Sequence, residues 1–365
     1  MLLRAGQRVG DSYEVERYLG EGAFAEVYRV RHDILGRQAM KVFKRAGTVG
    51  EIREMLGEAI LLSRIGHPNI VRVFHAGTAR TAFGDNGFFT MEYVAGGNLQ
   101  RFWVSHRDEH VPVPDVVRIV RQVAEGLAVA HLSTPAIVHR DITPQNILIG
   151  YDAGGLRARL SDFGLARGLN PLTMLASTRG TRAFKAPEAL ADPFGDSLAG
   201  DVWALGVICY LLLTDALPHE DRGPAARLGA AARTPPRPPE EFNPDVDPAL
   251  SRIVMAALEP DLAARTPHAG ALAAQLAQWQ QRCGGRRSPQ AVEPSPATTK
   301  GALGDRAADT EAEARRLAAR ARVLARQSVT LTDAADLMEA AFTKSPRLRG
   351  EHEHLLRMWR KGVMF

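Results

Sequence analysis

The sequence has few cysteines and no long apolar run. Cys209 and Cys283 are its only cysteines, too few for the disulfide framework of a small secreted domain. Its longest apolar run, residues 202–213, is well short of the ~20 residues that a membrane-spanning helix needs. The first fifteen residues lack the apolar core and small-residue cleavage site of a signal peptide. These absences favour a cytoplasmic protein without a membrane span.

An excess of charge is also missing from most of the chain. Residues 284–365 carry 15 Lys and Arg against 10 Asp and Glu, whereas the residues before them carry 31 of each kind. The whole excess of +5 therefore lies near the C-terminus. A balanced body argues against a protein dedicated to binding nucleic acid.

Hydrophobic patterning predicts a β-rich portion followed by a larger helical one. Apolar or alternating runs between Gly and Asn/Asp breaks predict strands at 13–19, 26–32, 37–43, 71–76 and 87–93. Helical spacing predicts helices at about 50–65, 114–132, 199–214, 248–258 and 267–282. The run at 202–213 falls within one of these helices, which we therefore expect to be buried.

A Gly/Pro/Ser-rich stretch at 283–309 predicts a flexible linker before a C-terminal tail. Thr310 and Glu313 form a capping-box pattern that opens a helix to about residue 327. Further helices are expected at about 333–344 and 345–361.

A glycine-rich loop lies between the first two predicted strands. Residues 19–27 read LGEGAFAEV, and Gly20 and Gly22 would let the backbone approach phosphate oxygens closely. An ordinary hairpin can have the same composition. Lys41 lies in the next predicted strand and needs a partner if it is buried. Glu58 on the following predicted helix is the candidate.

The strongest signal is the run VHRDITPQNIL at 138–148. Asp141 could accept the proton of a hydroxyl group, and Asn146 offers an oxygen ligand suited to Mg²⁺. Asp162, in the Asp-Phe-Gly sequence that follows, could bind the same ion. These parts match phosphoryl transfer from ATP, which requires the phosphates, a metal ion and an acceptor hydroxyl to be held in line.

The order of these motifs, with Gly180-Thr181, Ala186-Pro187-Glu188, the run DVWALG at 201–206 and Arg265, resembles the eukaryotic-type (Hanks-type) serine/threonine protein kinase family. The resemblance implies an α+β, two-lobed fold, with an N-lobe at about 12–94 and a helical C-lobe at about 95–282. Residues 1–11 would be an N-terminal extension, 283–309 the linker, and 310–365 a helical tail. The resemblance also implies an enzyme that uses ATP and Mg²⁺, or Mn²⁺, to phosphorylate Ser and Thr of protein substrates and of itself.

The resemblance assigns roles to individual residues. Lys41, paired with Glu58, would hold the phosphates, Asp141 would be the catalytic base, and Asn146 and Asp162 would bind the metal ion. The ATP site would consist of Leu19, Gly20, Gly22, Val27, Ala39, Lys41, Met91, Glu92, Val94 and Leu148. Structural or regulatory roles fall to His139, Arg140, Phe163, Gly164, Thr181, Glu188, Asp201 and Arg265. Ser177 and Thr178 are the expected autophosphorylation sites.

Two positions depart from the family pattern. Thr143 stands where these kinases usually carry Lys, and Ala25 stands where the phosphate loop usually has a third Gly. Loss of one preorganised contact to the transition state typically lowers the rate by about 10²–10³. Every ionisable catalytic position is present.

Two other interpretations fit less well. A catalytically inactive scaffold would have lost Lys41, Asp141 or Asp162. A small-molecule phosphotransferase would lack the Ala-Pro-Glu block and the segment before it. The chain retains Lys41, Asp141 and Asp162. It also has the Ala-Pro-Glu block and the segment before it, which favours the protein kinase.

The tail is expected to be a docking module for a partner protein. Its first helix is rich in Arg and suits nucleic acid or an acidic partner, although a solvated face has the same pattern and is more common. Deletion of residues 284–365 is therefore expected to leave activity on a short peptide nearly unchanged.

Overall fold

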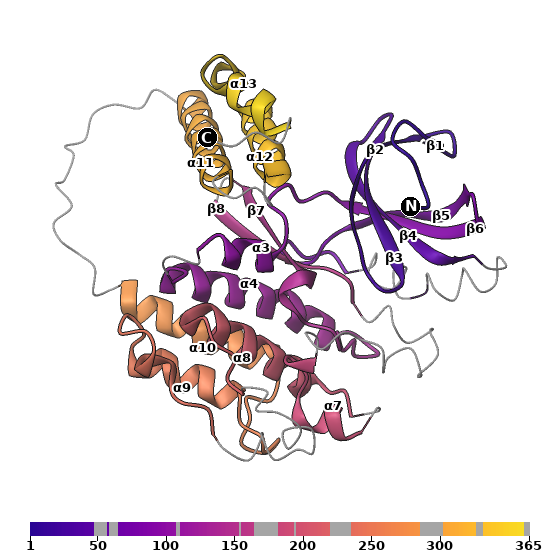
Figure 1. Cartoon of the computed structure of the whole chain (residues 1–365). Helices are drawn as coiled ribbons and strands as arrows, with labels where there is room; N and C mark the ends of the chain where they lie inside the picture. The colour runs from indigo at the N-terminus through magenta and orange to yellow at the C-terminus, as the bar shows by residue number, and fades with distance from the viewer. Residues whose placement is uncertain are drawn as a thin grey trace.

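The computed structural model describes residues 1–46, 57, 65–106, 110–152, 155–163, 182–192, 195–219, 235–284, 302–325 and 331–360. A β-rich N-lobe and a larger helical C-lobe form the expected α+β architecture, and three C-terminal helices lie beside the junction of the lobes (Figure 1). Among the described ranges, no helix combines the length and the apolarity needed to cross a bilayer.

The N-lobe is an antiparallel sheet of strand order β1-β2-β3-β4-β6-β5. Its strands are β1 (Arg8–Val9), β2 (Tyr13–Glu21), β3 (Ala25–His32), β4 (Gly36–Ala46), β5 (Val73–Thr81) and β6 (Gly84–Glu92). The five predicted strands are all present, and each overlaps its predicted range. Inward side chains such as Val15, Val30, Met40 and Val42 form one buried cluster of the lobe. The helix predicted at about 50–65 falls almost entirely outside the described residues.

The first eleven residues pack on the N-lobe through three buried side chains, Leu2, Leu3 and Val9. Leu2 and Leu3 are buried in the same cluster as Val15 and Val30. The Leu2 N–H donates to Glu26 Oε2 at 2.7 Å, and the Leu3 N–H donates to the Tyr28 hydroxyl at 3.0 Å. These contacts tie the N-terminus to β3, while the expected domain boundary at residue 12 stays a prediction.

The C-lobe contains the helices α3 (Leu99–Val104), α4 (Val113–His131), α7 (Pro187–Ala191), α8 (Leu198–Thr214), α9 (Pro248–Ala257) and α10 (Ala269–Gly284), the short 3₁₀ turns η1 (Pro144–Asn146) and η4 (Pro239–Glu241), and the hairpin β7 (Ile147–Asp152) and β8 (Gly155–Leu160). Residues 201–214 of α8 are buried around the whole helix, as expected for its apolar run. Ser197 caps α8 by accepting the Gly200 N–H at 2.9 Å. The C-lobe therefore packs around α8.

The C-terminal unit consists of α11 (Ala302–Leu324), α12 (Leu331–Lys344) and α13 (Arg347–Arg360). The three helices were predicted, but α11 begins within the stretch expected to be a linker. Leu317, Leu337, Phe342 and Trp359 are part of the unit's own apolar core. Ala95 and Tyr151 of the two-lobed body pack against this core. The unit is thus docked on the lobes.

Candidate active site

A charged pair joins the two lobes at the centre of the candidate site. Lys41 projects from β4, and its Nζ lies 2.7 Å from Oδ1 of Asp162, which follows β8. Only 14% of the Lys41 side chain and 27% of the Asp162 side chain are exposed. The expected partner Glu58 lies outside the described residues, so the pair of Lys41 and Glu58 stays a prediction.

An apolar cluster lies beside this pair and contains five of the residues expected around ATP. Strand register places Ala39 opposite Met91 and Val27 opposite Lys41. Leu19, Val27 and Leu148 pack against the buried Ala39 and Met91. Because Leu148 comes from β7 of the C-lobe, the cluster is built from both lobes, which suits contact with the two faces of a flat aromatic ring such as adenine.

The glycine-rich loop is the turn between β2 and β3. The Gly22 N–H donates to the Ala25 carbonyl at 2.9 Å, which closes the turn. A Cβ added at Gly20 or Gly22 would meet no atom within 4 Å, so both glycines border open space. The loop thus leaves room for a phosphate to approach its backbone.

Residues 92–97, here called the hinge, begin at the end of β6 and connect the lobes. Glu92 pairs with Arg159 of β8, with 3.1 Å between Oε1 and Nε. A Cβ at Gly96 would lie 2.2 Å from the Ile149 carbonyl oxygen, so the chain can pass this close to β7 only with glycine there. Val94 lies against Gly150 of β7. The hinge is therefore held closely against β7.

Asp141 and Asn146 meet in the loop that precedes β7. The Asn146 Nδ2 donates to the carbonyl oxygen of Asp141 at 2.8 Å and to its carboxylate Oδ2 at 3.0 Å. Burial raises the pKa of Asp141, although His139, the Asn146 hydrogen bond and Lys185 act against the shift. A raised pKa suits a carboxylate that accepts a proton during the reaction.

Asp201 of α8 holds this loop in place. Its Oδ2 accepts the backbone N–H of His139 at 2.7 Å, and its Oδ1 accepts that of Arg140 at 2.9 Å. His131 Nε2 lies 3.0 Å from the same carboxylate. Arg140 has a φ of 69°, an unfavourable conformation for a residue with a side chain. Asp201 stabilises this turn and so holds the next residue, Asp141, in position.

His139 connects the catalytic loop to the Asp-Phe-Gly segment. Its ring is fully buried and lies 4.5 Å from the Phe163 ring, and its Nε2 lies 2.9 Å from the Ser161 carbonyl oxygen. Burial lowers the pKa of His139. The neutral ring thus serves as a packed connector between the two segments that carry Asp141 and Asp162.

The oxygen atoms of Asn146 and Asp162 fit a hard divalent cation. The Ser161 N–H donates to the Asn146 carbonyl at 2.8 Å, which ties the start of the Asp162 segment to η1. Among the described residues there is no group of three or more His, Cys, Asp or Glu side chains that could hold a metal ion. An amide, a carboxylate and the phosphates of a substrate are the ligand set typical of Mg²⁺ in phosphoryl-transfer enzymes.

The expected ion pair between Glu188 and Arg265 forms. It is bidentate, with Nη1–Oε1 at 2.7 Å and Nη2–Oε2 at 3.0 Å, and the Arg265 side chain is completely buried. Arg265 also donates to the carbonyl oxygen of Glu259 at 2.7 Å and lies over the Trp203 ring. The pair fixes α7, which follows Ala186, against the C-lobe core.

Lys185 was not recognised from the sequence. Its Nζ donates to the carbonyl oxygen of Arg140 at 2.7 Å and lies 3.1 Å from Asp196 Oδ1. Lys185, Asp141 and Thr143 line one pocket beside the catalytic loop. A basic residue directly before Ala186-Pro187-Glu188 was the available signal.

Besides Glu58, four expected residues lie outside the described ranges: Gly164, Ser177, Thr178 and Thr181.

Comparison with known proteins identifies the family. The protein kinase domain model matches residues 13–276. The chain is 35% identical over 260 residues to the serine/threonine-protein kinase Pkn1 of Myxococcus xanthus, covering 69% of this chain and 36% of that protein. It is 32% identical over 280 residues to the DNA damage-responsive serine/threonine-protein kinase RqkA of Deinococcus radiodurans, covering 76% of this chain and 40% of that one.

Solved structures agree with the sequence relatives. The kinase domain of PknI from Mycobacterium tuberculosis is 27% identical, with a TM-score of 0.56, and the match covers 76% of this chain and 99% of that domain. The chain spans less than half the length of the two curated relatives named above. From the matched family and the geometry of the site, the chain belongs to the protein kinase domain family.

Proposed function

We propose that the protein is an ATP-dependent serine/threonine protein kinase. The observation that carries the proposal is the pairing of Lys41 with Asp162 across the lobes, next to the linked Asp141 and Asn146. The relatives named as serine/threonine kinases support the class of acceptor residue.

Different residues bind ATP and accept the proton of the acceptor hydroxyl. Bound ATP with its metal ion supplies the γ-phosphoryl group, and the apolar cluster around Ala39 and Met91 holds the adenine. The acceptor hydroxyl lies in the pocket next to Asp141, which orients it and takes its proton. The hydroxyl oxygen bonds to the γ-phosphorus as the bond from that phosphorus to the β–γ bridging oxygen breaks, and ADP leaves.

The metal ion is proposed to be Mg²⁺, with Mn²⁺ as the alternative, because the ligands are all oxygen atoms. Autophosphorylation at Ser177 or Thr178, a protein partner docked on 310–365 and a cytoplasmic location stay predictions from the sequence. For a partner on the tail, α11 offers the exposed residues Arg315, Arg316 and Arg322.

A phosphotransfer assay tests the proposal. Purified protein with Mg²⁺ and labelled ATP is expected to phosphorylate itself or a generic basic protein on Ser or Thr. Asp162→Ala is expected to abolish this incorporation, because it removes a metal ligand and the partner of Lys41. As a control, Asp245→Ala changes an exposed carboxylate far along the chain from the site. Equal incorporation by the wild type and Asp162→Ala would exclude the kinase, and label mainly on Tyr would exclude the proposed acceptor class.

A further inference from the structure

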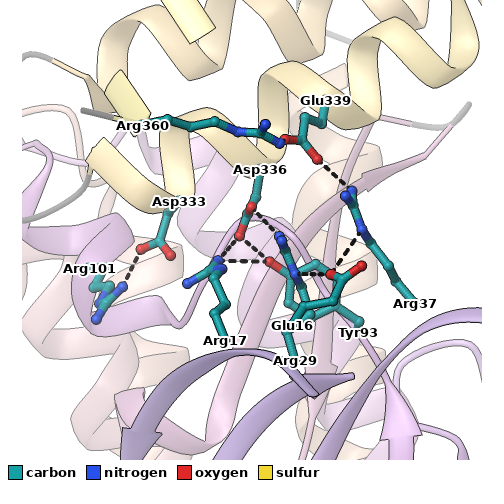
Figure 2. Close-up of polar contacts among 10 residues, drawn as sticks. All are labelled: Glu16, Arg17, Arg29, Arg37, Tyr93, Arg101, Asp333, Asp336, Glu339 and Arg360. Atoms are coloured by element: carbon teal, nitrogen blue, oxygen red, sulfur yellow. Dashed lines mark hydrogen bonds and ion pairs between the residues drawn. The ribbon is translucent and has the colours of Figure 1, made fainter. Parts of the chain in front are cut away.

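The helix α12 presents a row of carboxylates to arginines from both lobes (Figure 2). Asp333, Asp336 and Glu339 are three residues apart, so they lie along one side of the helix. Their partners lie far away in the chain, on β2, β3, β4 and α3. The contact is thus between the C-terminal unit and the two-lobed body of the same chain.

Asp336 pairs with two arginines that lie opposite each other on the N-lobe sheet. Arg17 on β2 and Arg29 on β3 are direct register partners, and like charges in that position repel. Asp336 Oδ1 lies 2.5 Å from Arg29 Nη1, and Oδ2 accepts a hydrogen bond from Arg17. Asp336 and Arg29 are almost fully buried. Glu16 pairs with Arg29 from the other side at 2.6 Å.

The same carboxylate contacts the hinge. The Tyr93 hydroxyl, directly after Glu92, donates a hydrogen bond to Asp336. Burial, reinforced by the charge of Asp336, raises the pKa of Tyr93, so the hydroxyl keeps its proton and remains a donor. One side chain of α12 therefore connects two strands of the N-lobe to the segment that would bind adenine.

The neighbouring carboxylates extend the contact to both sides of the hinge. On the N-lobe side, Glu339 pairs with Arg37 at 2.5 Å. On the C-lobe side, Asp333 pairs with Arg101 of α3. A Cβ added at Gly97 would lie only 3.1 Å from Asp333 Oδ2, so the carboxylate reaches the backbone at the end of the hinge.

A second helix of the unit holds the C-lobe. Arg320 of α11 donates to Ser105 Oγ at 2.9 Å and lies over the Phe102 ring, with 4.6 Å from Cζ to the ring centroid. Burial lowers the pKa of Arg320. Tyr151 at the end of β7 packs against the apolar core of the unit. The unit thus binds the N-lobe, the hinge and the C-lobe at once.

We infer that the C-terminal unit is a positioning element for ATP binding, with Asp336 and Asp333 as its positioning residues. The inference rests on the proposed function, since it assigns ATP to the site between the lobes. ATP must contact the strands of the N-lobe, the hinge and Asp162 together. The unit holds the N-lobe strands, the hinge and the C-lobe in the arrangement in which Lys41 already reaches Asp162. A unit that docks best on the ATP-binding arrangement and ATP itself must strengthen each other's binding equally.

Binding of a non-hydrolysable ATP analogue with Mg²⁺ to the full chain tests this coupling without catalysis. Calorimetry is expected to give a Kd about tenfold higher for Asp336→Asn than for the wild type, within the 5–150-fold range typical of coupled sites. The matched control is Glu353→Gln in α13, which removes the same charge from an exposed pair with Arg357. It is expected to leave the Kd unchanged.

Hydrogen exchange measures the reciprocal effect, which is the effect of the bound analogue on the docking of α12. Amides of α12 in the wild-type protein are expected to exchange several-fold more slowly with the analogue bound, and this protection is expected to be smaller in Asp336→Asn. Unchanged exchange in α12, or a wild-type Kd in a folded Asp336→Asn variant, would overturn the inference.

A second pair keeps the test decisive if Asp336→Asn does not fold. Arg101 and Asp333 are more exposed, and Arg101→Asp and Asp333→Arg are each expected to raise the Kd. The double variant restores opposite charges and is expected to recover most of the affinity. No effect of either single variant would overturn the inference. Because binding is measured without turnover, an inactive protein with intact coupling would contradict only the proposed kinase activity.

Discussion

Lys185 brings a positive charge to the pocket that contains Asp141. Its amine is fixed by the Arg140 carbonyl and by Asp196, and its charge acts against the raised pKa of Asp141. Thr143 lines the same pocket, is buried, and makes no side-chain cap of η1. Lys185 is therefore positioned to supply the cation that is missing at position 143.

Substitution of Lys185 tests this role. We expect Lys185→Met to lower kcat about 10²-fold, the usual effect of removing one preorganised charge contact. The KM for ATP is expected to change little, because Lys185 lies outside the apolar cluster. The exposed Arg252→Met in α9 is the control. Single-turnover and steady-state kinetics on one peptide provide the measurement.

A rescue experiment separates this role from a structural one. Thr143→Lys alone is expected to keep or raise kcat, and in the Lys185→Met background it is expected to restore at least part of the loss. If Thr143→Lys lowers kcat tenfold in a folded protein, Thr143 itself takes part in the reaction. A wild-type kcat in Lys185→Met would remove Lys185 from the mechanism.

At the scale of elements, α9 depends on one carboxylate for its first turn. Asp247 is the N-cap and accepts the N–H groups of Ala249 and Leu250, both at 2.8 Å. Its second oxygen accepts the Trp279 indole N–H of α10 at 2.8 Å. Burial acts to raise the pKa of Asp247, but the bonds from Leu250, Trp279 and Ala249 outweigh it and lower the pKa. Asp247 thus links two helices of the C-lobe.

Asp247→Ala is expected to lower the free energy of unfolding by about 2 kcal/mol, from loss of a cap and an unpaired indole N–H.

The direction of the pKa shift of Asp247 determines how its contribution to stability depends on pH. Since the folded-state pKa is depressed, the charge stabilises the fold above the ordinary Asp value of about 3.9 and ceases to do so as pH falls through the lower folded value. The difference between the wild type and Asp247→Asn in denaturant melts is expected to shrink over that range. Asp245→Asn, an exposed neighbour, is expected to show no such loss, and a difference independent of pH would contradict the assignment.

Local patterns predicted most of the regular elements. The strands β2 to β6 and the helices α4, α9 and α10 follow from alternation or helical spacing, and α8 follows from its continuous apolar run. The two-residue β1 exists only because Arg8 and Val9 pair with Glu14 and Tyr13, so no local pattern indicates it. The catalytic loop was predictable because Asp141 and Asn146 are close in sequence.

Contacts over long chain distances could not be read in this way. The carboxylates of α12 have the spacing of a solvated helix face, and the strands with Arg17 and Arg29 carry charges of both signs, as solvated strand faces do. The net charge of the tail predicted that the basic α11 would be the helix that contacts a partner. In the structure, the acidic side of α12 makes most of the ion pairs with the lobes. Only the folded arrangement shows that these charges meet.

At the scale of the whole molecule, the C-terminal unit is docked where the lobes are joined (Figure 1). We expect deletion of residues 285–365 to raise the KM for ATP about tenfold, as expected for typical coupling between sites, and to lower Tm by several degrees. The kcat at saturating ATP is expected to stay within about threefold, because the residues described for the pocket next to Asp141 all come from the two lobes. An unchanged KM for ATP in the folded deletion variant would instead support the independent docking module expected from the sequence.

The pair of arginines on β2 and β3 also sets an order of events during synthesis. Asp336 follows Arg29 by 307 residues, and a ribosome adds about 5–20 residues per second. For about 15–60 s the growing chain therefore has both arginines and Glu16 but lacks the Asp336 carboxylate that contacts both arginines. The contact of Asp336 with these arginines therefore forms only after α12 has been synthesised, so a chain that ends before α12 leaves Arg17 and Arg29 without this carboxylate.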